Sequence, residues 1–146
     1  MGSLTLPATG TIYLDSSAVI YAVERIEPYS TLLQPLWGAV QAGGLGLVTS
    51  ELTWLETLAK PLRDGNIALE QLFRAFLSAR GMSLFPATLP IWEQAARMRG
   101  LGLKTPDALH AATAIASGCS MFVTNDQGFR RVAGLPLCVL DSLLGP

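Results

Sequence analysis

Apolar positions along the chain form short unbroken runs that alternate with longer stretches of helical spacing. The short runs are rich in β-branched and aromatic residues, which is typical of strands. They lie at residues 11–15, 45–49, 82–86, 120–124 and within 135–141. Because a strand with one wet face alternates apolar and polar residues, unbroken apolar runs favour a parallel sheet that is covered on both faces.

The stretches between these runs predict helices. Apolar residues recur there at helical spacing over residues 16–26, 30–42, 51–60, 67–80, 89–99 and 105–117, and a short helical turn follows residue 126. Ser16 or Ser17 is a suitable N-cap for the first helix. Pro61 is expected to end the third, because proline removes a backbone hydrogen bond. Strands and helices in alternation over 146 residues predict a single α/β domain.

Two of the predicted strands end in a carboxylate. The run in "IYLDSS" stops at Asp15, and the run in "FVTNDQGF" stops just before Asp126. In a parallel sheet, ligands bind beyond the carboxyl ends of the strands. Asp15 and Asp126 are therefore expected at one rim of the sheet.

Each acidic residue near that rim also has a structural explanation. Asp15 suits the cap of the helix that follows it, and Asp126 suits the cap of the short turn after the fourth strand. Glu56 can pair with Lys60 one helical turn on. Asp107 lies in the first turn of a predicted helix, where the helix dipole favours acids. Taken one at a time, these explanations are sufficient.

Taken together, the four acids are harder to explain as structure alone. Carboxylates crowded at one rim raise one another's pKa and disfavour the fold unless a cation lies among them. Carboxylate oxygens are the ligands that Mg²⁺ and Mn²⁺ prefer, and such an ion can activate water for phosphoryl transfer. The acids therefore predict a divalent-metal site. His110, one turn after Asp107, is expected to be a partly buried structural residue.

Composition limits the classes of partner. Half of the residues are apolar, 14% are charged and the formal net charge is −1. A nucleic acid would therefore have to be held by local cations or through metal rather than by overall charge. The basic residues beside the site acids in the sequence are Lys104, Arg130 and Arg131, which makes them the predicted phosphate contacts. The high apolar content also indicates surface for a protein partner.

The sequence shows no sign of export or of a zinc cluster. The two cysteines lack CxxC spacing and there is one histidine, which argues against structural zinc. The stretch "MGSLTLPATG" has neither the basic nor the long apolar region of a secretory leader. No apolar run approaches the length of a membrane span. A reduced, cytoplasmic protein without a membrane segment is the expectation.

Four stretches of the chain together resemble the PIN domain family, and specifically its VapC-type toxin ribonucleases. In chain order they are "IYLDSSAVIYAVE", "VTSELTWLETLAKP", "LKTPDALHAATAIASG" and "MFVTNDQGF". The resemblance implies a three-layer α/β/α sandwich with a short, mainly parallel sheet. It further implies an endoribonuclease that depends on Mg²⁺ or Mn²⁺ and cleaves RNA as the toxin of a toxin–antitoxin pair. A homodimer and a cognate antitoxin are implied as well.

The same resemblance assigns roles to particular residues. It places the catalytic and metal-binding acids on Asp15, Glu56, Asp107 and Asp126. It adds a catalytic hydroxyl at Thr124 and polar support from Ser16, Ser17 and Asn125. The whole of residues 1–146 is taken as one PIN-like domain, with residues 1–10 as an extension or a cloning remnant before the first strand.

Other classes explain the pattern less well. A haloacid-dehalogenase-like phosphatase requires a second Asp where this chain has Ser17. A receiver-like domain requires a Lys after a late strand. A catalytically inactive PIN domain that binds RNA or protein remains the alternative. The sequence opposes it only in that all four acids are present.

Overall fold

A parallel sheet forms the centre of the structure. The computed structural model describes residues 2–145 and contains five strands, all parallel, in the order β3–β2–β1–β4–β5. The strands are β1 (Gly10–Leu14), β2 (Leu45–Ser50), β3 (Met82–Phe85), β4 (Met121–Thr124) and β5 (Leu137–Val139). The parallel sheet predicted from the apolar runs is therefore confirmed.

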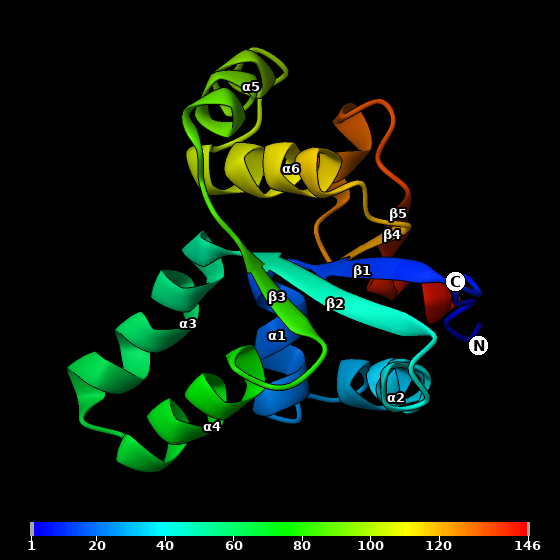
Figure 1. Cartoon of the computed structure of the whole chain (residues 1–146), viewed down its shortest axis with the longest axis vertical. Helices are drawn as coiled ribbons and strands as arrows, with labels where there is room; N and C mark the ends of the chain where they lie inside the picture. Colours follow the sequence, from blue (N-terminus) through cyan, green and yellow to red (C-terminus); the bar gives the residue numbers. More distant parts are fainter. Residues whose placement is uncertain (1, 146) are drawn as a thin grey trace.

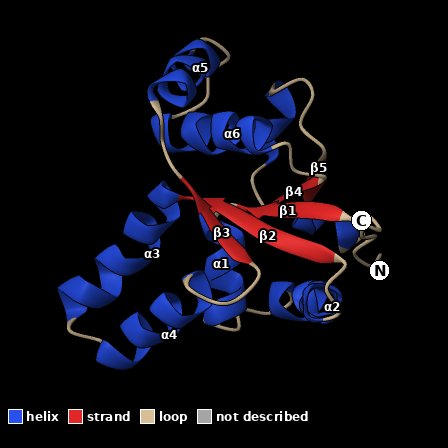
Figure 2. Cartoon of the chain, viewed as in Figure 1, coloured by secondary structure: helices blue, strands red, loops and turns tan. Residues whose placement is uncertain are grey.

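Helices cover both faces of this sheet (Figure 1). On one face lie α1 (Ser16–Val23), α2 (Tyr29–Gln41), α3 (Glu51–Asp64) and α4 (Ile67–Leu77), and on the other α5 (Leu89–Arg99) and α6 (Thr105–Ser117). The 3₁₀ helices η1 (Gln127–Arg131) and η2 (Leu140–Leu143) flank β5 in the chain. Figure 2 shows the layers as helix, strand and helix, which confirms the predicted α/β/α sandwich. None of the helices within residues 2–145 has the length and apolar character needed to cross a membrane.

The central strand β1 divides the core into two halves, because its side chains alternate between the faces of the sheet. Ile12 and Leu14 are fully buried in the half formed with α1–α4, whereas Tyr13 is fully buried in the half formed with α5 and α6. Tyr13 stacks on Phe122 of β4 with ring centres 5.0 Å apart. A strand that is buried on both faces needs apolar or aromatic residues throughout, which explains its unbroken apolar run.

The register between β1 and β4 brings two predicted site residues together. Leu14 pairs with Val123, so the next residues, Asp15 and Thr124, emerge side by side at the carboxyl ends of the two strands. β2 ends on the other side of β1 at Ser50, whose side chain caps α3. The strand ends therefore form the common rim that the sequence predicted.

The cap of α1 is Asp15, one of the residues that the sequence offered for it, and not Ser16 or Ser17. Its carboxylate accepts the Ala18 backbone N–H at 3.0 Å. Asp15 leaves the strand with extended dihedral angles, φ −78° and ψ 177°, which suit an N-cap. Ser17 lies inside the helix and donates its hydroxyl to Asp15.

The end of α3 differs from the prediction. The helix runs past Pro61 to Asp64 before it ends at Gly65. Gly65 adopts the left-handed conformation, with φ 65°, and the Asn66 N–H donates to the Pro61 carbonyl at 2.9 Å. This glycine closure satisfies the last carbonyls of the helix, so α3 ends at Gly65 and not at Pro61.

The residues before β1 pack against the C-terminal segment. Leu4 is buried in the α1–α4 half of the core. The Gly2 N–H donates to the Leu143 carbonyl at 2.6 Å. Residues 2–9 are therefore packed onto the folded domain.

Helix α6 packs on the sheet through alanine side chains. Ala108, Ala111, Ala112 and Ala114 are all buried, and α5 covers α6 on its other side (Figure 2). Small side chains allow a helix to approach its neighbours closely. This close approach keeps the start of α6, where Asp107 lies, near the rim of the sheet.

Replacement of Ala111 by leucine should therefore destabilise the protein. Ala111→Leu should lower the free energy of unfolding by about 1–3 kcal/mol, because added atoms in a packed space force side chains and backbone to move. Ala116→Leu makes the same change at an exposed position of the same helix. It should alter the free energy by no more than about 0.5 kcal/mol. Urea unfolding measures both, and equal effects would contradict tight packing of α6.

Candidate functional site

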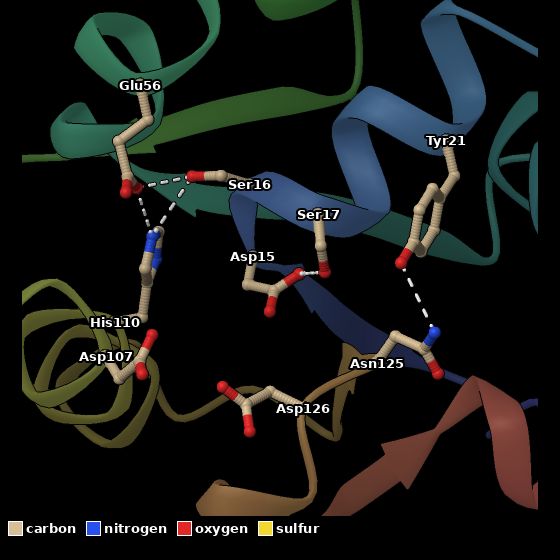
Figure 3. Close-up of a pocket in the computed structure, with 9 residues that line it drawn as sticks. All are labelled: Asp15, Ser16, Ser17, Tyr21, Glu56, Asp107, His110, Asn125 and Asp126. Carbon is tan, nitrogen blue, oxygen red and sulfur yellow. Dashed lines mark hydrogen bonds and ion pairs between the residues drawn. The ribbon is translucent and has the colours of Figure 1, made fainter. Parts of the chain in front are cut away.

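A cleft of about 350 Å³ opens at the carboxyl rim of the sheet (Figure 3). Four acids line it from separate elements: Asp15 after β1, Glu56 on α3, Asp107 on α6 and Asp126 after β4. The lining is completed by Ser16, Ser17, Tyr21, His110 and Asn125. The structure thus brings all four predicted acids to one cleft.

Asp15 is held by three hydrogen-bond donors. The Thr124 hydroxyl donates to Oδ2, while the Ser17 hydroxyl and the Ala18 N–H donate to Oδ1 at 2.7 and 3.0 Å. Burial raises the pKa of Asp15, and His110 opposes the rise most, followed by these hydrogen bonds, which stabilise the charged form. Asp15 is therefore the cap of α1 and a cleft residue at once, and the two explanations for it do not exclude one another.

The segment after β4 is held by hydrogen bonds to β4, η1, α1 and η2. The Asp126 N–H donates to the Thr124 hydroxyl oxygen at 3.1 Å, and the Asp126 carboxylate accepts a backbone N–H of η1 at 2.8 Å. The Asn125 amide donates to the Tyr21 hydroxyl at 3.2 Å and accepts the Asp141 N–H at 2.8 Å. Asn125 therefore ties this wall of the cleft to α1 and to η2.

Asp107 receives the least support of the four acids. Its carboxylate has no hydrogen-bond donor among residues 2–145. Burial raises the pKa of Asp107, and the charge of Asp126 raises it further, with smaller effects from Asp15 and Glu56. Figure 3 shows the carboxylates of the three aspartates facing a common space. A cation bound in that space would relieve their repulsion.

Glu56 is held by a hydroxyl and an imidazole. Its Oε1 lies 2.5 Å from Ser16 Oγ and 2.7 Å from His110 Nε2. Burial raises the pKa of Glu56, but the hydrogen bonds from His110 and Ser16 outweigh burial and leave the pKa below its ordinary value. Glu56 is therefore a carboxylate, not a carboxylic acid, at neutral pH.

The acidic side chains of the cleft are chemically suited to bind a metal ion, although they do not converge on a single position in this structure. Within residues 2–145, no three His, Cys, Asp or Glu side chains already form a set that could hold a metal ion. Mg²⁺ needs only one or two carboxylates together with several waters. Hard oxygen donors spread along an open cleft, with repulsion raising the pKa of Asp107, meet that requirement.

A second cleft of about 290 Å³ adjoins the first and shares Asp107 and Asp126 with it. Lys104 and Arg131 line this second cleft, and Arg131 Nη1 donates to the Gly102 carbonyl at 3.3 Å. Two of the three predicted phosphate contacts are therefore next to the acids.

Arg130 points elsewhere. Its guanidinium donates to Gln127 at 2.5 Å and to Ser142 at 3.0 Å, and it lines neither cleft. Neighbouring residues of the short helix η1 thus face different ways, which the sequence order alone does not show.

Two lining residues were not expected in the site. Sequence reasoning treated His110 as structural and did not consider Tyr21, yet both line the cleft. The available signal was helical spacing, since His110 follows Asp107 by three residues and Tyr21 follows Ser17 by four. Residues at these spacings share a helix face.

Comparison with protein families identifies the family to which the chain belongs. The model of the PIN domain matches residues 12–135, so the chain belongs to the PIN domain family. This range contains all four acids of the cleft. Comparison with curated proteins finds no match.

Solved structures with a similar fold come from toxin–antitoxin systems. VapBC2 from Rickettsia felis, bound to a DNA fragment from its promoter, is 20% identical with a TM-score of 0.67, over 88% of this chain and 98% of that chain. VapC20 from Mycobacterium tuberculosis, a Sarcin-Ricin loop cleaving toxin, is 16% identical with a TM-score of 0.69, over 86% and 97%. A toxin–antitoxin complex from Klebsiella pneumoniae is 22% identical with a TM-score of 0.64, over 88% and 96%. At these identities the likeness shows a shared fold.

Removal of the Asp107 charge should not destabilise the metal-free protein. The pKa of Asp107 is raised in the folded state. The folded chain therefore holds a proton more readily than the unfolded chain. The stability that protonated Asp107 contributes is present at low pH. It is lost as pH rises from the ordinary aspartate pKa of about 3.9 through the raised pKa of Asp107 in the folded state. Asp107→Asn has no such charge, so its melting temperature in EDTA should equal or exceed that of the wild type at neutral pH.

The same variant should lose stabilisation by Mn²⁺. A ligand that binds only the folded state raises the melting temperature of the wild type, and Asp107→Asn should show a much smaller rise. Thermal unfolding with and without Mn²⁺ measures the difference. A lower melting temperature of Asp107→Asn in EDTA at every pH would instead identify Asp107 as a structural cap.

Proposed function

We propose that the protein is a metal-dependent endoribonuclease that acts as the toxin of a toxin–antitoxin pair. The observation that carries this proposal is the cleft at the sheet rim, where Asp15, Glu56, Asp107 and Asp126 come together from four elements of a PIN-family chain. Acidic oxygen donors beside a basic cleft suit the hydrolysis of a phosphodiester, because the reaction needs both metal and phosphate binding.

The similar structures agree with this proposal. VapC20 from Mycobacterium tuberculosis is a Sarcin-Ricin loop cleaving toxin, and the Klebsiella pneumoniae structure is a toxin–antitoxin complex. We extend that chemistry to this chain because of its own cleft, since identities of 16–22% support the fold only.

The residues that would hold Mg²⁺ or Mn²⁺ are Asp15, Asp107 and Asp126, with Glu56 at the edge of the cleft. Such an ion, when bound, supplies charge to the phosphate oxygens and lowers the pKa of an attacking water. Thr124 keeps Asp15 in place through its hydroxyl. Glu56 is ionised, and its Oε2 receives no hydrogen bond from the described residues, so that oxygen is available to the cleft.

The second cleft gives the RNA backbone a path beside the acids. Lys104 and Arg131 flank the two aspartates that the clefts share. A chain of net charge −1 with an acidic centre repels RNA unless local cations offset the repulsion. We therefore assign phosphate binding to Lys104 and Arg131 and not to Arg130.

A protein partner has a suitable surface on α3 and α4. Leu55, Leu62, Ile67 and Leu72 are large apolar side chains that are more than half exposed on these two helices. Apolar side chains gathered on neighbouring helices are typical of an interaction surface. An antitoxin or a second copy of the chain is the proposed occupant.

One observation favours the alternative of an inactive PIN domain that binds RNA or protein. The described residues contain no ready-made ligand set for a metal. This alternative predicts RNA binding without cleavage in the presence of either ion, so the cleavage assay decides between the two.

The purified chain should cleave RNA when Mg²⁺ or Mn²⁺ is present and not in EDTA. Asp107→Asn should lower the rate by roughly a hundredfold or more, because it removes a ligand of the ion that would stabilise the charge of the transition state. Asp64→Asn, an acid-to-amide change at an exposed acid at the end of α3, is the control and should retain the wild-type rate. Sequencing of the new RNA ends in total RNA measures cleavage and its site. Cleavage that persists in EDTA would contradict the metal requirement.

Arg131→Ala and Lys104→Ala should each weaken RNA binding and flatten its salt dependence. Each lost phosphate contact should reduce the slope of log affinity against log salt by about 0.7 for a single strand. Arg130→Ala removes the same charge from the same short helix and should leave the slope unchanged. Fluorescence anisotropy with a catalytically silent Asp107→Asn background measures the slopes. An equal change for Arg130→Ala would show that the path does not follow the second cleft.

A further inference from the structure

His110 joins four elements of the structure through one buried imidazole. It lies on α6 with only 3% of its surface exposed. Its Nδ1 lies 2.7 Å from the Tyr13 hydroxyl of β1, and its Nε2 lies 2.7 Å from Glu56 Oε1 of α3. Ser16 Oγ of α1 lies 3.2 Å from the same Nε2. Figure 3 shows the imidazole directed at Glu56 and Ser16.

The position of each proton in this chain of bonds follows from Glu56 and from the burial of Tyr13. The Tyr13 hydroxyl is fully buried and lies 2.7 Å from His110 Nδ1, and the Ser50 backbone and the Thr49 side chain also hydrogen-bond to it. His110 Nε2 lies 2.7 Å from Oε1 of the ionised Glu56, which can only accept, so Nε2 carries a hydrogen. Nδ1 is then the unprotonated nitrogen of the neutral ring and accepts the Tyr13 hydroxyl, which would lose free energy without an acceptor.

We propose that His110 is a positioning residue of the cleft: Tyr13 fixes it in the Nε2–H tautomer, and in that form it fixes Glu56 in the orientation that the cleft requires. The consequence for Glu56 is geometric. Two donors, His110 Nε2–H and the Ser16 hydroxyl, occupy Oε1 and so direct Oε2 to the cleft. The role in catalysis rests on the proposed nuclease function, whereas the tautomer and the fixed carboxylate do not.

The sheet explains why the tyrosine is available for this task. Side chains alternate between the faces of a strand, and Tyr13 packs on the α6 side of β1, two residues before Asp15, which follows the end of that strand. One strand therefore supplies a cleft acid at its end and, one pleat earlier, the hydroxyl that sets the imidazole. Stacking on Phe122 holds the tyrosine ring in place.

A purely structural histidine would behave differently from a positioning one. A structural residue is required for volume and packing, so any side chain of similar size serves. A positioning residue is required for a donor at one point in space. Glutamine can place an amide N–H near the Nε2 position, whereas asparagine is shorter by one methylene and its amide reaches only the Nδ1 position.

The tautomer can be observed directly, because His110 is the only histidine in the chain. In the metal-free wild type labelled with ¹⁵N-histidine, NMR should show one imidazole with an unprotonated Nδ1 and a protonated Nε2. Tyr13→Phe should weaken this preference, because Glu56 alone then favours a protonated Nε2 and nothing donates to Nδ1. It should also weaken Mn²⁺ binding, because the imidazole no longer holds Glu56 in one orientation. A wild-type ring in the Nδ1–H form, or doubly protonated at neutral pH, would overturn the proposal.

The second measurement compares His110→Gln with His110→Asn and with His110→Met, which matches glutamine in size but has no donor. His110→Asn and His110→Met should both lose roughly tenfold to a hundredfold in Mn²⁺ affinity and kcat, the range found when a residue that orients a metal ligand is removed. His110→Gln should stay within a few-fold of the wild type, and KM for RNA should change little in all three. Equal losses in His110→Gln and His110→Met would overturn the proposal. If His110→Asn does not fold, as judged by circular dichroism, Tyr13→Phe decides, since it removes a single oxygen.

These readouts separate failure of the proposal from failure of the nuclease assignment. A wild-type protein that cleaves no RNA ends the nuclease assignment, while NMR and Mn²⁺ affinity still decide the role of His110. An active protein whose imidazole has the wrong tautomer ends the role of His110 and leaves the nuclease assignment intact.

Discussion

Repulsion among carboxylates is the constraint on which this site depends. Four acids can occupy one cleft only if each negative charge is met by donors from the chain or by an ion. The chain meets two of them fully: Asp15 receives three donors and Glu56 receives two. Asp126 receives one backbone N–H, and Asp107 receives none from the described residues. The uncompensated charge therefore lies on the side of Asp107 and Asp126, beside the basic cleft.

The parallel sheet makes this distribution possible. All its strands end at one rim, so residues remote in sequence meet without long loops. The alternation of β1 serves both the core and the site: Leu14 packs against α1–α4, whereas Tyr13 packs on the α6 side and reaches His110. The alanines of α6 let that helix lie close to the sheet and bring Asp107 and His110 to the rim. The contacts that pack the core thus also position the charged side chains at the rim.

The fold and the position of Asp15 and Asp126 at the rim could be predicted from the sequence, because both depend on periodicity and on residue order. Unbroken apolar runs located all five strands, and acids at strand ends pointed to the rim. Finer geometry could not be predicted, because it depends on side-chain direction. The sequence does not show that Arg131 faces the second cleft while Arg130 faces Ser142. Nor does it show that α3 continues beyond Pro61 to Asp64, or that Tyr13 reaches His110 across the core. Each of these depends on tertiary contacts.

The pairing of β1 with β4 has a consequence for synthesis on the ribosome. Ile12 pairs with Met121, and Asp15 receives its hydroxyl donor from Thr124, so contacts that span most of the chain complete the sheet. Contacts of such separation form late in folding. A nascent chain that has not yet exposed β4 lacks the central strand pair, Thr124 and Asp126, and has no complete cleft. The order of translation therefore delays the assembly of the acidic centre until β4 and Asp126 have been made.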